Sequence, residues 1–451
     1  MINNNPSMQK AIQLFLSQHI KPQQPILLAL SGGLDSCVLL HLLATAKHTI
    51  PFNLYAMHVH HGLSANANQW AEFCQQQCDL LNVSLTIAHV NVEQHTKLGI
   101  EAAARQLRYD ALFNYQCNEI TPDFIVTAHH QDDQAETLLL QLFRGAGVKG
   151  LASMAAIDKS RRILRPLLDV SRLSLQAYAT QHGITWCDDE SNNNLHFERN
   201  FVRHEVLPII EARNPAIKTV LARSALHLAE ANDLLNALAA LDAQSLLSDN
   251  SVCLQGLAKL DLARTKNLLR YWFANNQLEM PSAEHLAEIT QQLFNAKADA
   301  NIDIQLSQKN QLQHLSLKRF QQRAYLIKVQ EVQSFDVVWN GEPELNLPNG
   351  GQLTFKQVVG KGLALKFGMT KLRISQRNGG ESFKPNVLRP TRTLKHLLQE
   401  ANIPPWQRDH LPLIYWQDTL AFVPGIGTSH ELQASENEPG LEIIWQPDTP
   451  A

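Results

Sequence analysis

A short glycine-containing loop has the residue types that bind a phosphate group. It reads Ser31-Gly32-Gly33-Leu34-Asp35-Ser36 and lies between two apolar stretches. Backbone N–H groups at such a loop, with a helix N-terminus behind them, attract an anion, and the glycines let phosphate oxygens approach. Ser31 and Ser36 add hydroxyl donors, whereas Asp35 would repel phosphate unless a cation lay between them. We therefore predict bound nucleotide with Mg²⁺ at Asp35. A plain turn with a helix cap is the alternative.

A second group of polar residues follows a later apolar stretch, in the segment Thr127-Ala128-His129-His130-Gln131-Asp132-Asp133-Gln134-Ala135-Glu136-Thr137. Asp132 and Glu136 are four residues apart, so on a helix they would share a face. Together with Asp133 they could hold Mg²⁺, bind an ammonium group or accept a proton. His130 is placed to stabilise charge on a phosphate. Acids that merely favour a helix N-terminus are the structural alternative.

Four arginines complete the candidate chemistry. Arg199 and Arg203 are also four residues apart and could hold a carboxylate or a phosphate in a forked geometry. Structural salt bridges are their alternative role. Arg105 and Arg108 lie on a predicted helix and could stabilise negative charge on a phosphate, although Arg105 could instead pair with Glu101 along that helix.

The elements that must position these residues alternate between strands and helices. Apolar runs at 25–30, 53–60, 84–92 and 123–130 predict strands, and the amphipathic stretches between them predict helices. This alternation predicts a doubly wound, mostly parallel sheet. In such sheets ligands bind at the carboxyl ends of the strands, which is where the loop and the His129–His130 pair fall.

Three domains are expected along the 451 residues. Residues 1–215 would form an α/β catalytic domain and 216–325 a helical middle domain. Residues 326–451 would form a small α+β domain. The stretch from about 215 to 300 is rich in Ala and Leu and reads as almost wholly helical, whereas strand patterns return after residue 301.

The net charge of −3 hides a basic segment. Residues 355–410 contain eleven Lys and Arg residues but only three acidic ones, a net charge of +8. A local excess of this kind is typical of a polyanion-binding surface. The residues expected to contact a nucleic acid there are Lys371, Arg373, Arg377, Lys384, Lys395 and Arg408.

The composition bears on the setting of the protein. The sequence contains no apolar run of about 18 residues, so we expect no membrane span. Its start lacks a basic head, so we expect no secretion signal. The six scattered cysteines form no CxxC pair, which favours reduced thiols and a cytoplasmic location. Cys74 and Cys78 could share a metal, but two buried small side chains are the preferred interpretation.

Further segments complete a recognisable set. They read His60-His61-Gly62, Arg144-Gly145-Ala146-Gly147, Arg165-Pro166-Leu167-Leu168, Arg199-Asn200-Phe201-Val202-Arg203, Arg377-Asn378-Gly379-Gly380-Glu381 and Pro404-Pro405-Trp406-Gln407-Arg408. The loop at 31–36 lacks the lysine of a Walker A motif and resembles the pyrophosphate loop (PP-loop) of the N-type ATP pyrophosphatases. With the other segments in this order, the chain resembles the tRNA(Ile)-lysidine synthetase family. The resemblance spans nearly the whole chain and is weakest at roughly 216–320.

This resemblance implies an ATP-dependent ligase. The enzyme would adenylate the C2 oxygen of the wobble cytidine in a CAU-anticodon tRNA(Ile) and release pyrophosphate. The ε-amine of free L-lysine would then displace AMP, forming lysidine and switching decoding from AUG to AUA. ATP and Mg²⁺ are the implied cofactors, and neither a membrane nor an obligate protein partner is implied.

The resemblance also assigns site residues. Catalytic roles fall to Asp35, His130, Asp132, Asp133, Glu136, Arg199 and Arg203. ATP would contact Ser31, Gly32, Gly33, Leu34, Asp35, Ser36, His60, Arg105 and Arg108, with Mg²⁺ at Asp35 and Asp133.

Two other functions remain open. A PP-loop tRNA thiolase would share the loop but would need paired cysteines, and the spacing of Cys74 and Cys78 does not fit that requirement. A non-catalytic RNA-binding protein would be expected to carry a degenerate loop, whereas this loop is intact.

Overall fold

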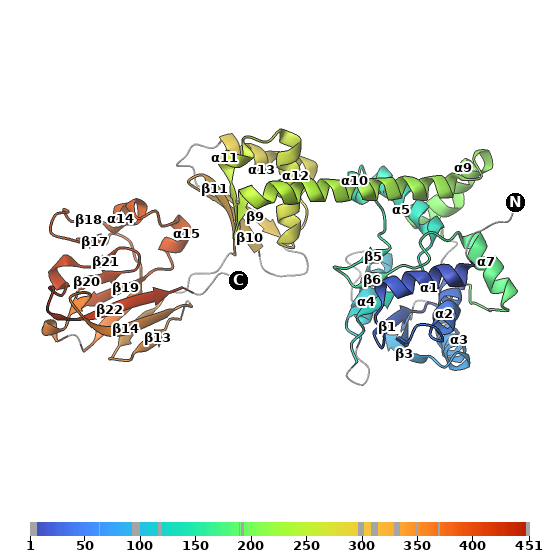
Figure 1. The fold of residues 1–451 in the computed structure, drawn as a ribbon, viewed down its shortest axis with the longest axis horizontal. Helices are drawn as coiled ribbons and strands as arrows, with labels where there is room; N and C mark the ends of the chain where they lie inside the picture. The colour runs from blue at the N-terminus through green and yellow to red at the C-terminus, as the bar shows by residue number, and fades with distance from the viewer. Residues whose placement is uncertain are drawn as a thin grey trace. The chain divides into compact units, whose positions relative to one another are not determined.

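The computed structural model describes residues 7–62, 64–92, 100–115, 120–188, 190, 194–295, 302–307, 314–328, 334–348, 350–368 and 370–447. The chain divides into two compact units, Met1–Asn236 and Ala237–Ala451. The division falls within one continuous helix, α10, which spans Ile217–Leu246 (Figure 1).

The first unit contains the predicted alternation of strands and helices. Its elements are α1 Met8–His19, β1 Pro25–Ala29, α2 Leu34–Ala46, β2 Asn53–His60, α3 Ala67–Leu80, β3 Ser84–His89, α4 Ile100–Phe113, β4 Phe124–Val126, α5 Gln131–Phe143, α6 Val148–Leu151, β5 Ile157–Asp158, β6 Ile163–Leu164, α7 Arg172–Gln181, α8 Glu198–Phe201, the π-helix η3 Val202–Val206 and α9 Leu207–Arg213. The strands form one sheet in the order β3-β2-β1-β4-β6-β5. All neighbours are parallel except β5, which pairs antiparallel with β6. The prediction of a doubly wound, mostly parallel sheet is confirmed.

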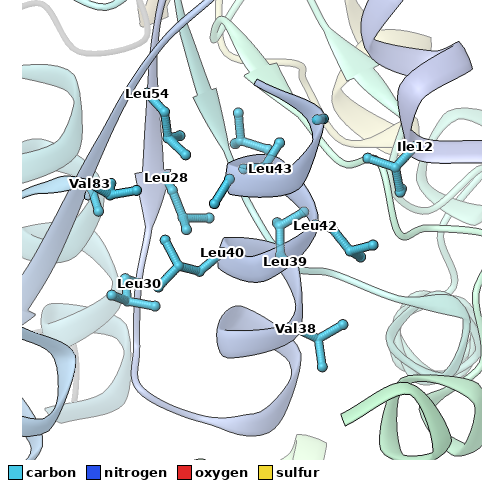
Figure 2. Close-up of a cluster of buried hydrophobic side chains, with 14 of the residues drawn as sticks. Ile12, Leu28, Leu30, Val38, Leu39, Leu40, Leu42, Leu43, Leu54 and Val83 are labelled. Carbon is cyan, nitrogen blue, oxygen red and sulfur yellow. The ribbon is translucent and has the colours of Figure 1, made fainter. Parts of the chain in front are cut away.

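The two faces of β1 pack into two different cores, which explains why this strand is apolar throughout. Leu28 packs among residues of α1, α2 and α7, including Ile12 and Leu43 (Figure 2). Leu27, on the other face, packs against Leu112 of α4 and Ile125 of β4. Cys74 and Cys78 are fully buried in the first of these cores, as the interpretation of two buried small side chains requires.

The strand order places the phosphate loop at a reversal of the sheet. From β1 the chain adds β2 and β3 on one side, and β4 then pairs with the opposite edge of β1. Loops that leave β1 and β4 therefore diverge above the sheet and leave a crevice between them. The loop at 31–36 follows β1, and His129 and His130 follow β4, so the topology brings the two predicted motifs to the same crevice.

The second unit begins with an α+β region. Its elements after α10 are β7 Leu247–Ser248, β8 Ser251–Cys253, α11 Leu254–Leu257, α12 Leu262–Asn275, α13 Ala283–Asn295, β9 Asp303–Ser307, β10 His314–Phe320 and β11 Arg323–Lys328. The helices match the predicted Ala/Leu-rich stretch. However, the five strands form one sheet in the order β7-β8-β11-β10-β9.

The expectation that residues 215–300 are almost wholly helical is therefore incomplete. The short strands β7 and β8 interrupt the helices. They pair with each other, and β8 also pairs with β11, some 70 residues later in the chain. Trp272 and Phe273 of α12 pack with Leu317 and Leu326 of this sheet. The helices α11 to α13 and the strands after 301 thus share one core, and no pattern within either stretch reveals the other.

The rest of the second unit is rich in strands. It contains β12 Asp336–Trp339, β13 Glu344–Asn346, β14 Gln352–Val359, β15 Leu363–Ala364, the 3₁₀ turn η4 Leu365–Phe367, β16 Leu372–Gln376, β17 Ser382–Phe383, β18 Arg392–Thr393, α14 Leu394–Glu400, α15 Pro405–Arg408, β19 Pro412–Trp416, β20 Thr419–Val423, β21 Gly427–Thr428, the 3₁₀ turn η5 His430–Leu432 and β22 Pro439–Gln446. They form sheets in the orders β12-β16-β19-β20-β21 and β13-β14-β22-β15, with β17 and β18 as a separate pair. With α14 and α15, this is the predicted small α+β region.

In the part of the chain that the structure describes, no helix is both long enough and apolar enough to cross a membrane.

We predict that Leu28→Ala destabilises the first unit by about 2–5 kcal/mol, because the truncation leaves a cavity at a fully buried position. Urea unfolding followed by tryptophan fluorescence measures the effect. Leu80→Ala is the matched control, since Leu80 is 74% exposed and its truncation should change stability by no more than about 0.5 kcal/mol. Equal unfolding midpoints for Leu28→Ala and Leu80→Ala would contradict the core assignment.

Candidate active site

The loop at 31–36 is fixed by its own serines. The Ser36 hydroxyl accepts the Gly32 N–H at 3.1 Å and donates to the Gly33 carbonyl at 2.9 Å. Gly32 has a φ of +87°, a left-handed conformation that strains any residue with a side chain. A Cβ there would also lie 3.1 Å from Cys74 Sγ of α3. Glycine is therefore required at 32 both by the backbone and by the neighbouring helix.

Asp35 lies opposite His130 across the crevice. Asp35 is in the first turn of α2, and its Oδ2 lies 3.4 Å from His130 Nε2. The other oxygen, Oδ1, is buried and has no hydrogen-bond partner among the described residues. An unpaired buried carboxylate oxygen is costly, so this atom is a ready ligand for a cation. The sequence-predicted pair of Asp35 and His130 is brought into contact by the fold.

Two histidines that are adjacent in sequence carry opposite electrostatic character. Burial works against protonation of His130, but Asp35, Asp133 and Asp132 outweigh it and raise the pKa of His130. Burial also lowers the pKa of His129, and there Arg165 and Arg199 add to the effect, so it lies well below the ordinary value. At neutral pH His129 is an uncharged ring whose Nδ1 lies 2.9 Å from Thr127 Oγ1. His130 is the one suited to interact with negative charge.

Two arginines and two carboxylates form what we call the arginine–carboxylate network: Asp133, Glu136, Arg199 and Arg203. Arg199 donates from Nε to Glu136 at 2.8 Å and from Nη2 to Asp133 at 2.9 Å. Arg203 donates to both oxygens of Glu136, at 2.6 and 2.9 Å, and lies 3.4 Å from Asp133. Glu136 is only 1% exposed, so its charge depends on these partners.

The π-helix η3 positions the second arginine. Arg199 lies in α8, and Arg203 lies in η3, the segment of wider turn that follows it. Widened turns of this kind change the direction in which later side chains leave a helix and are frequent at functional sites. Both guanidinium groups reach the same face of α5, where Asp133 and Glu136 are one turn apart.

The network lowers the pKa of Asp133. Burial acts in the opposite direction, but His130 and Arg199 hold the pKa of this carboxyl well below its usual range. Its oxygens are occupied: Oδ1 accepts from Arg199, and Oδ2 accepts the His130 backbone N–H at 3.0 Å. Arg203, which faces Glu136 and Asp133, has a raised pKa in spite of its burial. Asp133 and Arg203 are therefore both charged at neutral pH.

Asp132 does not join this network. The sequence suggested that Asp132 and Glu136 share a face of α5, but Asp132 Oδ2 pairs with Lys218 Nζ of α10 at 3.1 Å. Its Oδ1 accepts the Arg172 N–H at 3.0 Å. The helix begins at Gln131, so Asp132 lies in its first turn and points toward α7 and α10. The two carboxylates that act together are Asp133 and Glu136, three residues apart.

Two adjoining cavities open at the crevice. The first, about 230 Å³, is lined by strand ends and apolar side chains that include Met57, Val59 and Leu112. The second, about 380 Å³, is lined by charged residues that include Asp133, Arg199 and Arg203. Both linings share Ser31, Asp35, Trp70, Arg105, Arg108 and His129. His60 lines the first cavity, and its Nε2 donates to Asn68 Oδ1 at 2.9 Å.

The structure adds residues that the sequence did not single out. Trp70 and Phe197 line the second cavity, as do Cys187 and Asp188. The Cys187 N–H donates to the Gly32 carbonyl at 2.9 Å, which ties the segment at 187–188 to the phosphate loop. For Cys187 and Asp188, the acidic stretch around residue 188 was a sequence signal that could have identified them. Trp70 had no such signal, because it lies in an otherwise ordinary amphipathic helix.

The predicted RNA-binding residues of the second unit differ in whether their side chains already have a partner within the protein. Arg373 pairs with Asp336 at 3.4 Å and lies over the Tyr415 ring, and Arg377 pairs with Glu381 at 3.4 Å. Arg408 donates to the Ile403 carbonyl at 2.7 Å. For Lys371, Lys384 and Lys395 the described residues provide no ion-pair partner.

Comparison with known proteins identifies the family. A family model described as a PP-loop domain matches residues 4–210, a TilS substrate binding domain matches 253–325 and a TilS substrate C-terminal domain matches 372–445. The tRNA(Ile)-lysidine synthase of Nitrosomonas europaea is 39% identical over 96% of this chain and 94% of its own. That of Serratia proteamaculans is 39% identical over 99% of this chain and all of its own. The chain belongs to the tRNA(Ile)-lysidine synthase family.

Membership makes the protein an ATP-using PP-loop enzyme and sets the thiolase and the non-catalytic alternatives aside. A solved U34-tRNA thiolase from Methanococcus maripaludis is 18% identical, with a TM-score of 0.44 over 49% of this chain and 78% of its own. A likeness this low has no bearing on the reaction.

We predict that Glu136→Gln destabilises the first unit, because two guanidinium groups would keep only one charged partner. Breaking a buried ion pair costs about 3–5 kcal/mol, and the value here should be lower because the arginine side chains are 22–23% exposed. Urea unfolding measures it.

The control for this variant is Glu211→Gln, which removes a carboxylate that pairs with Lys218 but is 38% exposed. It should cost no more than about 1 kcal/mol. If both variants unfold at the same urea concentration, Glu136 does not anchor the network.

Proposed function

We propose that this enzyme joins free L-lysine to C2 of the wobble cytidine of a CAU-anticodon tRNA(Ile), through an adenylated cytidine. The observation that carries the proposal is the position of the phosphate loop at the junction of two cavities, one whose lining mixes apolar and polar side chains and one that is more highly charged. Family membership supports it. The reaction would take place in the cytoplasm, where tRNA and free lysine are both available.

The first half-reaction needs a nucleotide held by its phosphates. Adenosine fits the first cavity, and its phosphates would lie against the N–H groups of the loop at 31–36. The cytosine C2 oxygen attacks the α-phosphorus, and the bond to the β-phosphate oxygen breaks to release pyrophosphate. Negative charge grows on the phosphate oxygens, and the raised pKa of His130 favours a positive charge beside Asp35, 3.4 Å away, although this buried ring is in the lining of neither cavity. Arg105 and Arg108 line the same junction.

Mg²⁺ fits one of its two predicted ligands better than the other. Asp35 has a buried oxygen without a partner, and a cation there would neutralise the repulsion between Asp35 and the phosphates. Asp133 has both oxygens engaged, by Arg199 and by the His130 N–H. We therefore assign Mg²⁺ to Asp35 and the ATP phosphates, and assign Asp133 to orienting His130 and Arg199.

The second half-reaction needs a lysine ε-amine beside the activated base. The amine nitrogen attacks C2 of the adenylated cytosine, the C2–O bond breaks, and AMP leaves. The second cavity adjoins the phosphate loop and offers cationic groups for an anion. Arg199 and Arg203 use Nε and Nη2 within the network, which leaves their Nη1 groups to hold the lysine carboxylate or an RNA phosphate.

The carboxylates of α5 then have different roles. Glu136 is buried under the two arginines and positions them, instead of binding lysine itself. Asp132, which pairs with Lys218 and the Arg172 N–H, holds the first turn of α5 in place. The basic residues of the second unit, with Lys371, Lys384 and Lys395 the freest, would contact the tRNA backbone and position the anticodon without reading it. We propose that residues 1–215 carry out catalysis and that residues 216–325 and 326–451 bind the tRNA.

The test of the function is lysine incorporation. We expect radiolabelled lysine, ATP and Mg²⁺ to label tRNA(Ile) with the CAU anticodon at the wobble cytidine, with one AMP and one pyrophosphate released per lysine. Methionine tRNA, which shares the anticodon, is the control and should remain unlabelled. Pyrophosphate release that requires a sulfur donor and incorporates no lysine would instead support a thiolase.

Asp35→Asn and Asp35→Ala should reduce pyrophosphate release by at least about 100-fold, because the cation that offsets phosphate charge loses its anchor. Pyrophosphate is measured over a range of Mg²⁺ concentrations with tRNA and ATP in excess. Asp79→Asn, a change at an exposed aspartate of α3 whose carboxylate bonds only to Gln75 among the described residues, is the control. A near-normal rate for either Asp35 variant would remove Asp35 from the mechanism.

A further inference from the structure

Trp70 lies where the two cavities of the active site meet. It belongs to α3, and its side chain lines both cavities, together with Ser31, Asp35 and His129. The residue is half-buried. Among the residues that the structure describes, no aromatic ring packs against the indole, and no arginine or lysine lies over its face. An apolar ring of this size is thus presented to the cavities instead of to the protein core.

The position of Trp70 is set by the same helix that shapes the phosphate loop. Cys74, one turn further along α3, is fully buried, and its Sγ limits the space above Gly32. His58 of β2 lies 3.5 Å from that sulfur. The helix is therefore fixed against the loop, so the ring has a defined place beside the phosphate site.

The chemistry proposed above, on which this inference rests, requires a base at that same place. The cytosine oxygen has to reach the α-phosphorus, and the phosphates lie at the loop shared by the two cavities. With adenosine in the first cavity, the cytosine must enter from the second and stop at the junction. A base that reacts in this way has left its stack in the RNA, and proteins usually replace the lost stacking with an aromatic face.

Most of the second cavity offers charge instead of a flat apolar surface. Its lining includes Asp133, Arg172, Asp188, Arg199 and Arg203. Three aromatic rings are present, Trp70, Phe197 and the imidazole of His129, and of these Trp70 and His129 also line the first cavity. His129 is held by Thr127 and has a much smaller ring, so Trp70 offers the larger flat apolar face at the junction. Phe197 precedes Arg199 by two residues and so belongs to the side of the cavity where we place the lysine.

We propose that Trp70 is the stacking platform for the target cytosine and that it orients the base with its C2 oxygen toward the α-phosphorus. Trp70 is then a specificity-determining residue of the tRNA site. The ring selects a planar base at the wobble position, while the neighbouring polar groups decide which base reacts.

The experiment compares Trp70→Ala with Trp70→Phe under single-turnover conditions, with saturating ATP and CAU-anticodon tRNA(Ile). Base–aromatic stacking predicts a loss of about 5- to 150-fold in the rate of lysidine formation for the alanine variant. The phenylalanine variant keeps a ring and should recover most of that loss. Affinity for a non-cleavable ATP analogue, measured by equilibrium dialysis, should change less than about twofold in both.

A binding measurement separates stacking from a general structural effect. Wild-type enzyme should lose affinity when the tRNA carries an abasic residue at the wobble position. Trp70→Ala should bind the intact and the abasic tRNA about equally, because the partner of the base is already gone. Phe143→Ala, which removes a ring that is 59% exposed at the end of α5, is the control and should behave as the wild type.

Two results would overturn the proposal. An unchanged rate of lysidine formation in Trp70→Ala would show that the ring is not used. A loss of ATP-analogue affinity as large as the loss of rate would show that Trp70 stacks on adenine instead. If the proposed reaction itself were wrong, the result would be distinguishable, because the wild-type enzyme would then form no lysidine with any tRNA.

Discussion

The arginine–carboxylate network is the interaction on which the rest of the active site depends. Glu136 is almost fully buried, and Arg199 and Arg203 supply its hydrogen-bond partners. These arginines in turn hold Asp133, whose other oxygen fixes the backbone of His130. His130 then reaches across to Asp35 in the phosphate loop. One chain of short contacts thus joins α8 and η3, through α5, to the loop after β1, and a buried charge anywhere along it cannot be left unpaired.

This arrangement gives different roles to carboxylates that look alike in sequence. A carboxylate with both oxygens engaged cannot also bind a metal or an amine without breaking the bonds that hold it. Asp133 and Glu136 are in that condition, whereas Asp35 has a buried oxygen without a partner. In the function that we propose, the cation and the phosphates would lie on the α2 side of the crevice, and the substrate that carries an anion would lie on the arginine side. Trp70 lies at the border between the two.

The second unit shows how tertiary contacts revise a charge pattern. The segment at 355–410 is strongly basic in sequence, yet several of its cations have acidic partners from outside the segment. Lys361 pairs with Glu442 of β22, and Lys366 pairs with Glu438. Within the segment, Arg389 and Arg392 both pair with Glu400. Such exposed pairs are weak and can be exchanged for phosphate contacts. Among the predicted RNA contacts, Lys371, Lys384 and Lys395 have no acidic partner to exchange within the described residues.

The sequence by itself determined the fold class of the first unit, its phosphate loop and the family, because apolar periodicity and a loop next to a strand are local features. It also placed the loop and His130 at the same sheet edge, since parallel strands bring their carboxyl ends together. Only the tertiary structure decided that Asp133, not Asp132, pairs with the arginines, because one residue on a helix changes direction by about 100° and the start of α5 sets the phase. The same holds for β8, which pairs with β11 some 70 residues away, and for Trp70, which is an ordinary helical residue until the crevice forms beside it. In each case the deciding contact joins residues far apart in the chain, and no local pattern encodes it.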